Sequence, residues 1–147
     1  YLRDLGIPLN TDSTIKGQTV FLAERAAELM NENVITDRTV IDVMAFTSLA
    51  KSISIIDSDS FEDYASRLLG EYDYIFYVSP EGVEIEDNGV RETDTEYREL
   101  VDFSINRFLD RYSYRIKNLV KLKGTTDERI EAFKEAILPQ YLYQNTW

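Results

Sequence analysis

The stretch Tyr-Ile-Phe-Tyr-Val-Ser-Pro at residues 74–80 decides the fold class of this chain. Five aromatic and β-branched residues in succession are typical of a strand buried on both faces, and the Ser-Pro pair ends it. Leu-Val-Lys-Leu at residues 119–122 predicts a second strand. A β-branched run at residues 33–37, which ends on an acid, predicts another buried strand.

Helical patterns fill the segments between these runs. The expected helices span residues 17–31, 39–51, 59–70, 93–112 and 125–139. Pairs with capping-box spacing mark three of their starts, and a Gly and a Pro mark two ends: Asp59 with Glu62, Thr93 with Glu96, Thr125 with Glu128, Gly70 and Pro139. No hairpin turn joins any two strands, so we expect crossover connections. The sequence therefore predicts one α/β domain over residues 1–147, with a parallel sheet covered by helices on both faces.

Composition narrows the chemistry that such a domain can perform. The chain has 147 residues, 44% hydrophobic and 29% charged, which is ordinary for a globular protein. It contains neither cysteine nor histidine, which excludes disulfides, thiolate catalysis and imidazole bases. Catalysis would rest on carboxylates, Lys, Arg, Tyr and hydroxyl groups, together with an oxygen-liganded cation such as Mg²⁺.

The net charge of −11 bears on partners. So acidic a surface repels a nucleic-acid polymer and an anionic membrane, although a few local arginines can still hold a small phosphorylated ligand. No apolar run is long enough to span a bilayer, and no signal-peptide pattern opens the chain. The expected location is cytoplasmic.

Ligands of open parallel sheets bind beyond the carboxyl ends of the strands, and three segments lie there. The first is Asp37-Arg38-Thr39. Asp37 could hold a metal through water or accept a proton from a substrate hydroxyl, and Arg38 could bind a phosphate or carboxylate. The structural alternative is that Asp37 caps the following helix and Arg38 pairs with it.

The second segment is an acidic loop that ends at Arg91, with Arg98 two turns further along. An arginine loop over a cleft is how kinases screen the charge of a transferring phosphoryl group, whereas the alternative is a solvated surface loop. The third segment is Gly124-Thr125, which could present backbone amides to a nucleotide or simply cap a helix.

Taken in order, these segments resemble the P-loop kinase-like AAA domain family, which includes ribosylnicotinamide-kinase-like proteins and relatives of nucleoside and nucleotide kinases. The resemblance runs from Tyr1 to about Ile137 and is most specific at residues 35–39 and 87–91. It implies a three-layer P-loop NTPase-like fold that binds ATP and Mg²⁺. The roles it implies are Asp37 near the Mg²⁺ and the acceptor, Arg38 and Thr39 at the acceptor, Arg91 with Arg98 over the ATP phosphates, and Gly124 with Thr125 near the adenine.

The chain departs from the family at one motif. No Gly-x-x-x-x-Gly-Lys-Ser/Thr occurs in the sequence, so the phosphate-cradling loop, its lysine and its Mg²⁺-binding hydroxyl are absent from it. In the family that loop follows the central strand, and without this strand the sheet would have a gap. We therefore expect the chain to be the C-terminal portion of a longer protein, or a degenerate relative that has lost ATP binding.

Two functions follow from these patterns. The first is an ATP-dependent phosphotransferase, a kinase that acts on a nucleoside, nucleotide or similar metabolite. Asp37 and Arg91 would be its catalytic residues. The second is a non-catalytic, kinase-like interaction subunit that docks on a protein partner or on another copy through its aromatic tail, Tyr141, Tyr143 and Trp147.

Overall fold

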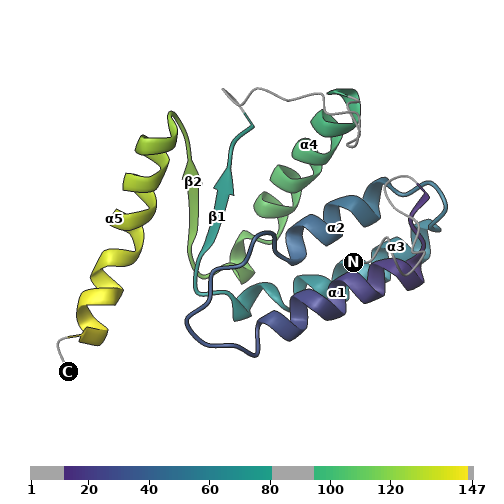
Figure 1. Ribbon diagram of the computed structural model, residues 1–147. Coiled ribbons are helices and arrows are strands. Elements are labelled where there is room, and N and C mark those ends of the chain that lie inside the picture. Colours follow the sequence, from purple (N-terminus) through teal and green to yellow (C-terminus); the bar gives the residue numbers. More distant parts are fainter. Residues whose placement is uncertain (1–11, 81–94, 146–147) are drawn as a thin grey trace. The chain divides into compact units, whose positions relative to one another are not determined.

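The computed structural model describes residues 12–80 and 95–145, of which residues 139–145 are described by their backbone alone. Its elements follow in the order α1 (Ile15–Glu28), α2 (Val40–Leu49), α3 (Ile55–Ser66), η2 (Leu69–Glu71), β1 (Ile75–Val78), α4 (Thr95–Arg111), η3 (Ser113–Arg115), β2 (Leu119–Leu122) and α5 (Thr126–Asn145) (Figure 1). The chain forms two compact units. We call the one with α1, α2, α3 and α4 the helical unit, and the one with β1, β2 and α5 the sheet unit, and we describe each by itself.

Helix α2 is the core of the helical unit. It packs against α1, α3 and α4, and its residues Val40, Ile41, Val43, Met44 and Ala45 are all buried. A helix that is apolar nearly all round needs neighbours on several sides, because each fully buried aliphatic side chain contributes about 1.5–3 kcal/mol. The predicted buried helix at residues 39–51 is therefore confirmed.

The start of α2 is held by three hydrogen bonds. The amide of Ile41 donates to Thr39 Oγ1 at 3.1 Å, and the amide of Thr39 donates to Asp42 Oδ2 at 2.9 Å. The amide of Val40 donates to the hydroxyl of Tyr72 at 3.2 Å. Because the first amides of a helix have no partner within the helix, these side chains fix where α2 begins.

The sheet unit confirms the α/β class and the parallel pairing. Strands β1 and β2 lie parallel in a two-stranded sheet, with Ile75 opposite Leu119 and Val78 opposite Leu122. Helix α5 runs beside them (Figure 1). Its Phe133 ring lies 4.7 Å from the ring of Phe76, in a tilted arrangement. A parallel pair needs such a covering helix, because its apolar faces are costly to leave in water.

Three expectations of the sequence are wrong. Residues 33–37 form no strand, and Val34 and Ile35 are 51% and 81% exposed. A β-branched run becomes a strand only when another strand pairs with it, and none in the described part of the chain does. Helix α3 begins at Ile55, because the Ser54 hydroxyl accepts from the amide of Asp57, so the predicted capping pair Asp59 and Glu62 lies inside it.

The third wrong expectation is the end of the last helix, since α5 continues through Pro139 to Asn145. A proline inside a helix removes one hydrogen bond and crowds the preceding turn, which weakens the helix without forcing it to stop. The expected start at Thr93 lies outside the described residues.

Candidate functional site

The corner at residues 36–39 joins the segment after α1 to the start of α2. Arg38 has a φ of 78°, in the left-handed region that side chains other than Gly seldom adopt. Two hydrogen bonds hold the corner: Thr36 Oγ1 donates to the carbonyl of Arg38 at 3.0 Å, and Arg25 Nη1 of α1 donates to the carbonyl of Asp37 at 3.1 Å. The left-handed backbone of a non-Gly residue costs about 1–2 kcal/mol, and it persists only where surrounding contacts impose it.

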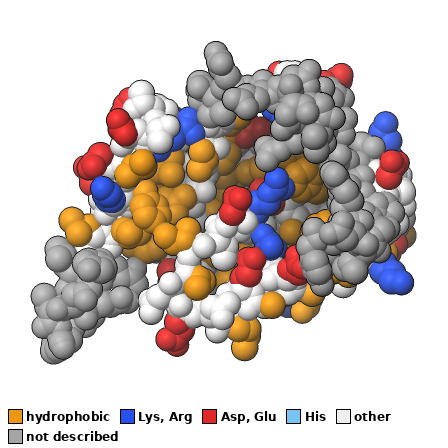
Figure 2. All heavy atoms as spheres, in the orientation of Figure 1, with side chains coloured by type: hydrophobic (Ala, Val, Ile, Leu, Met, Phe, Trp, Pro, Cys, Tyr) orange, Lys and Arg blue, Asp and Glu red, His pale blue; other side chains and the backbone are white. Residues whose placement is uncertain are grey.

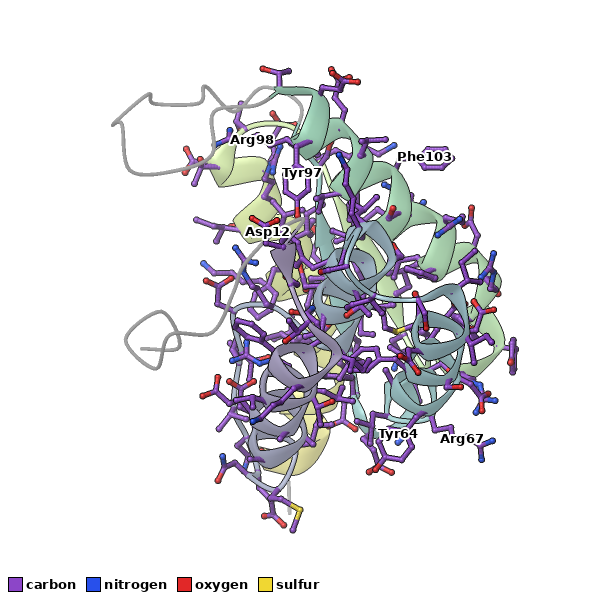
Figure 3. The ribbon with its side chains drawn as sticks, turned by 90° about the vertical axis from the view of Figure 1, so that its right-hand side faces the viewer. Asp12, Tyr64, Arg67, Tyr97, Arg98 and Phe103 are labelled. Carbon is purple, nitrogen blue, oxygen red and sulfur yellow. The ribbon has the colours of Figure 1, made fainter. Side chains whose placement is uncertain are left out.

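The guanidinium of Arg38 lies on an aromatic pair that links α2 to α4. Its carbon Cζ is 5.5 Å from the centre of the Phe46 ring. That ring is stacked with Tyr97 at 6.5 Å between centres. Tyr97 and the half-buried Arg98 lie in the first turns of α4, at the same end of the helical unit as Asp12 (Figure 3). The fold thus connects the corner, through two rings, to the part of α4 that carries Arg98.

The structural alternative for this corner fails in both of its parts. Thr39, not Asp37, is the residue whose side chain caps α2. Arg38 lies over Phe46. The carboxylate of Asp37 is exposed. An exposed carboxylate beside an arginine that is held in place by its backbone is suited to a substrate that carries both a hydroxyl and an anionic group.

Asp42 is a residue of this corner that the sequence reasoning missed. Burial raises the pKa of Asp42, and the nearby Asp37 raises it further, while the hydrogen bond from the Thr39 amide and the charge of Arg38 act to lower it. Its carboxylate closes the capping box that holds Thr39, so it positions the corner from the α2 side. The spacing Thr-x-x-Asp was the signal that could have revealed it.

The remaining predicted site residues fall into two groups. Arg91 lies outside the described residues. Gly124 and Thr125 belong to the sheet unit, which is not placed relative to the corner. There Gly124 has a φ of +90°. The Thr125 amide donates to Glu128 Oε1 at 3.3 Å, and the Glu128 amide donates to Thr125 Oγ1 at 3.2 Å. The predicted helix cap is confirmed, while the nucleotide role of this turn stays a prediction.

The carboxyl edge of the sheet unit carries an arginine that the sequence reasoning also missed. Arg129 Nη1 donates to the carbonyl of Ser79, and its Nε donates to the carbonyl of Gly124, both at 2.9 Å. Beside it lies an open hollow of about 380 Å³. Its lining is mostly apolar: Val78, Leu122, Thr126, Arg129, Ile130 and Phe133. Figure 2 shows hydrophobic side chains gathered over α5 and the neighbouring strands.

Comparison with protein-family models matches residues 8–129 to a model described as an AAA domain. The chain belongs to this AAA domain family. The family is of the P-loop NTPase type, so the match indicates nucleotide binding as the class of activity and includes both the corner and the turn after β2. Comparisons with curated proteins and with solved structures give no significant match.

Mg²⁺ is the ion that usually accompanies nucleotides in this family. Within residues 12–80 and 95–138, no three carboxylates lie close enough together to form a metal site of their own. Mg²⁺ is often held by one or two carboxylates with substrate phosphates and water, and Asp37 suits that arrangement. Bound there with a nucleotide, the ion would supply charge neutralisation.

No helix in the described part of the AAA domain has both the length and the apolar character needed to cross a membrane.

Proposed function

We propose that this AAA domain takes part in ATP-dependent phosphoryl transfer to a small acceptor, a nucleoside, nucleotide or similar metabolite. The observation that carries the proposal is the left-handed backbone conformation of Arg38, next to the exposed carboxylate of Asp37. Strained backbone in a non-Gly residue is concentrated at functional sites, where contacts keep a side chain in a required direction. The family supports nucleotide binding, and the corner supplies a base and an anion-binding group.

Each residue has a distinct part in this proposal. Asp37 accepts the proton of the acceptor hydroxyl or orders the Mg²⁺. Arg38, whose Cζ lies 5.5 Å from the centre of the Phe46 ring, binds an anionic group of the acceptor through its N–H donors. Thr39 holds the corner as the cap of α2, next to the acceptor. Arg91, supported by Arg98, screens the phosphate charge, and Gly124 with Thr125 contacts the base.

The sheet arrangement is also part of the proposal. We place the parallel pair β1 and β2 in a three-layer sheet of the P-loop NTPase type. Phosphoryl transfer further requires a phosphate cradle, and the Gly-x-x-x-x-Gly-Lys-Ser/Thr form of that cradle does not occur in these 147 residues. The experiments below therefore use the protein as it occurs in the cell.

Isothermal titration with Mg²⁺-ATP tests the nucleotide part of the proposal, with Mg²⁺-GTP as the matched ligand. We expect binding with one site per chain. A coupled assay for ADP release, run on a panel of nucleosides and nucleoside monophosphates, then tests the transfer. Turnover should fall at least tenfold in Asp37→Asn, whereas Asp59→Asn, an exposed aspartate of α3, should retain it. Failure to bind any nucleotide would refute the proposal.

The second candidate is a kinase-like interaction subunit without catalysis. Large hydrophobic side chains that the helical unit exposes favour it. Tyr64 and Phe103 are 63% and 67% exposed, on α3 and α4 (Figure 3). Nucleotide binding without turnover of any acceptor in the panel would favour this candidate. Truncation of the aromatic tail should then abolish association of the chain with its protein partner or with another copy.

A further inference from the structure

Arg25 connects helix α1 to the corner at residues 36–39. Its Nη1 donates to the carbonyl of Asp37 at 3.1 Å, and its Nη2 lies 2.9 Å from Glu28 Oε1, one turn further along α1. The Arg25 side chain is 19% exposed, so water weakens these two contacts less than it would at the surface. Because a guanidinium carries its donors in a fixed fork, the ion pair with Glu28 on one arm orients the other arm toward the corner.

The carbonyl of Asp37 is an atom through which Arg25 can orient two site residues at once. A peptide group is planar, so this carbonyl lies in one rigid plane with the amide of Arg38. The direction of that plane depends on ψ of Asp37 and on φ of Arg38. A hydrogen bond to the carbonyl therefore constrains both angles, among them the φ of 78° at Arg38. It thereby constrains the directions in which both side chains leave the backbone.

The peptide plane on the other side of Arg38 is held locally. Thr36 Oγ1 donates to the carbonyl of Arg38 at 3.0 Å. Because Thr36 belongs to the corner itself, this bond shapes the corner but does not fix it against the rest of the fold. Arg25 does so, since it belongs to a helix that packs against α2 (Figure 1). A functional group is held more precisely when a rigid element supports it, and here that element is α1.

We infer that Arg25 is a positioning residue for the phosphoryl acceptor: by holding the carbonyl of Asp37, it keeps the Asp37 carboxylate and the Arg38 guanidinium in directions that one acceptor can meet. The inference rests on the proposed function and deepens it. Arg25 donates to the backbone of the corner, so it acts through Asp37 and Arg38. A misplacement of reacting groups by about 1 Å can cost about a hundredfold in rate.

The test compares Arg25→Met and Arg25→Lys with the wild type, in the ADP-release assay and in the protein as it occurs in the cell. Methionine is a good helix former but donates no hydrogen bond, whereas lysine can pair with Glu28 but cannot hold two partners in one plane. We expect kcat/KM for the acceptor to fall roughly tenfold or more in Arg25→Met and at least about threefold in Arg25→Lys. The loss should appear as a raised KM for the acceptor and a lowered kcat, with the KM for ATP unchanged.

Arg67→Met is the matched control, because it removes an exposed arginine that pairs with Asp63 at 3.3 Å, and it should keep kcat/KM within about twofold of the wild type. A purely structural role of Arg25 would reduce the active fraction, and hence kcat, without changing either KM. An unchanged acceptor KM would therefore overturn the inference, and Arg25→Lys decides if Arg25→Met does not fold. A wild type without turnover of any acceptor refutes the proposed function and this inference together, whereas an active wild type with an unchanged acceptor KM in the variants refutes this inference alone.

Hydrogen exchange followed by NMR supplies the second measurement. The amide of Thr39 donates to Asp42 Oδ2 at 2.9 Å, and it should exchange faster in Arg25→Met than in the wild type, because the corner is no longer held from α1. Adding Arg38→Gly to Arg25→Met should slow this exchange again, because glycine takes a positive φ without strain. Unchanged exchange of the Thr39 amide in Arg25→Met would overturn the inference, since the corner would then keep its shape without Arg25.

Discussion

At the scale of single residues, Arg38 shows how function and local strain coincide. Its φ of 78° is unfavourable for an arginine, and its side chain is exposed. This backbone conformation directs the Arg38 side chain over the Phe46 ring, while the Asp37 side chain is exposed to solvent. A residue selected for stability alone would be Gly or Asn at this position.

This strain gives the first prediction. Arg38→Gly should be more stable than Arg38→Ala by about 1 kcal/mol, because both lose the contact with Phe46 but only Gly relieves the left-handed backbone. Urea unfolding followed by far-UV circular dichroism measures the difference. Both variants should be inactive in the ADP-release assay, so stability and activity should separate. If the alanine variant is as stable as the glycine variant, the left-handed backbone at residue 38 is not strained.

Asp42 gives the second prediction, through its raised pKa. A carboxyl whose pKa is higher in the folded state binds its proton more tightly there than in the unfolded chain. Its contribution to stability is therefore fully present below the ordinary value of 3.8 and is lost as the pH rises through the raised value. The difference in unfolding free energy between wild type and Asp42→Asn should decrease from pH 3.8 toward neutrality.

Two variants separate the charge of Asp42 from its hydrogen bond. Asn can still accept from the Thr39 amide, whereas Ala cannot, so Asp42→Ala should be less stable than Asp42→Asn by about 1 kcal/mol at every pH. Urea unfolding at a series of pH values measures both effects. A wild-type advantage over Asp42→Asn that grows with pH would show that the hydrogen bond and Arg38 outweigh burial.

At the scale of elements, a buried polar pair fixes α1 against α2. Gln18 Nε2 donates to Thr47 Oγ1 at 2.9 Å, and Thr47 Oγ1 donates to the carbonyl of Val43 at 2.7 Å. Gln18 and Thr47 are each only 2% exposed. Polar groups so deeply buried are tolerated because they are paired, and the pairing permits one register of the two helices.

This pair gives the third prediction. Thr47→Val should lower the free energy of unfolding by about 1–3 kcal/mol, because the amide of Gln18 is then buried without its partner. The double variant Gln18→Leu with Thr47→Val should lose less than the sum of the two single variants, since neither partner is left unsatisfied. A double-mutant cycle by urea unfolding measures the coupling, and strict additivity would contradict it.

At the scale of the whole molecule, charge is the property that involves every element. The chain carries 27 acidic and 16 basic residues, so like charges predominate on its surface. Self-repulsion of this kind opposes the compact state and is weakened by salt, because the screening length is about 8 Å at physiological ionic strength.

The fourth prediction follows. The melting temperature should rise when sodium chloride is increased from about 10 mM to about 150 mM. Lys134→Glu changes the net charge from −11 to −13, since one positive charge is replaced by a negative one, and it should enlarge this rise. Differential scanning calorimetry of both proteins at the two salt concentrations measures it. A melting temperature that falls with salt in both proteins would show that attractive ion pairs dominate instead.

The sequence determined those features whose signals are local. The runs at residues 75–78 and 119–122, the apolar helix α2 and the cap of α5 by Thr125 and Glu128 were all predictable, because propensity, spacing and capping act within a few residues. The same local signals located Asp37 and Arg38 as candidates. They also found the family, which the comparison confirms.

Only the tertiary structure decided the features that need a distant partner. Residues 33–37 have strand propensity, yet no described strand pairs with them, and all of them except the half-buried Thr36 are exposed. The left-handed φ of Arg38 is imposed by Arg25 and Thr36 rather than by its own preference. The bridge from Arg129 to Ser79 spans 50 positions of sequence, and no local pattern can reveal such a contact. Residue type and local spacing identify the candidate side chains, but the orientations of these side chains depend on contacts between residues that are distant in the sequence.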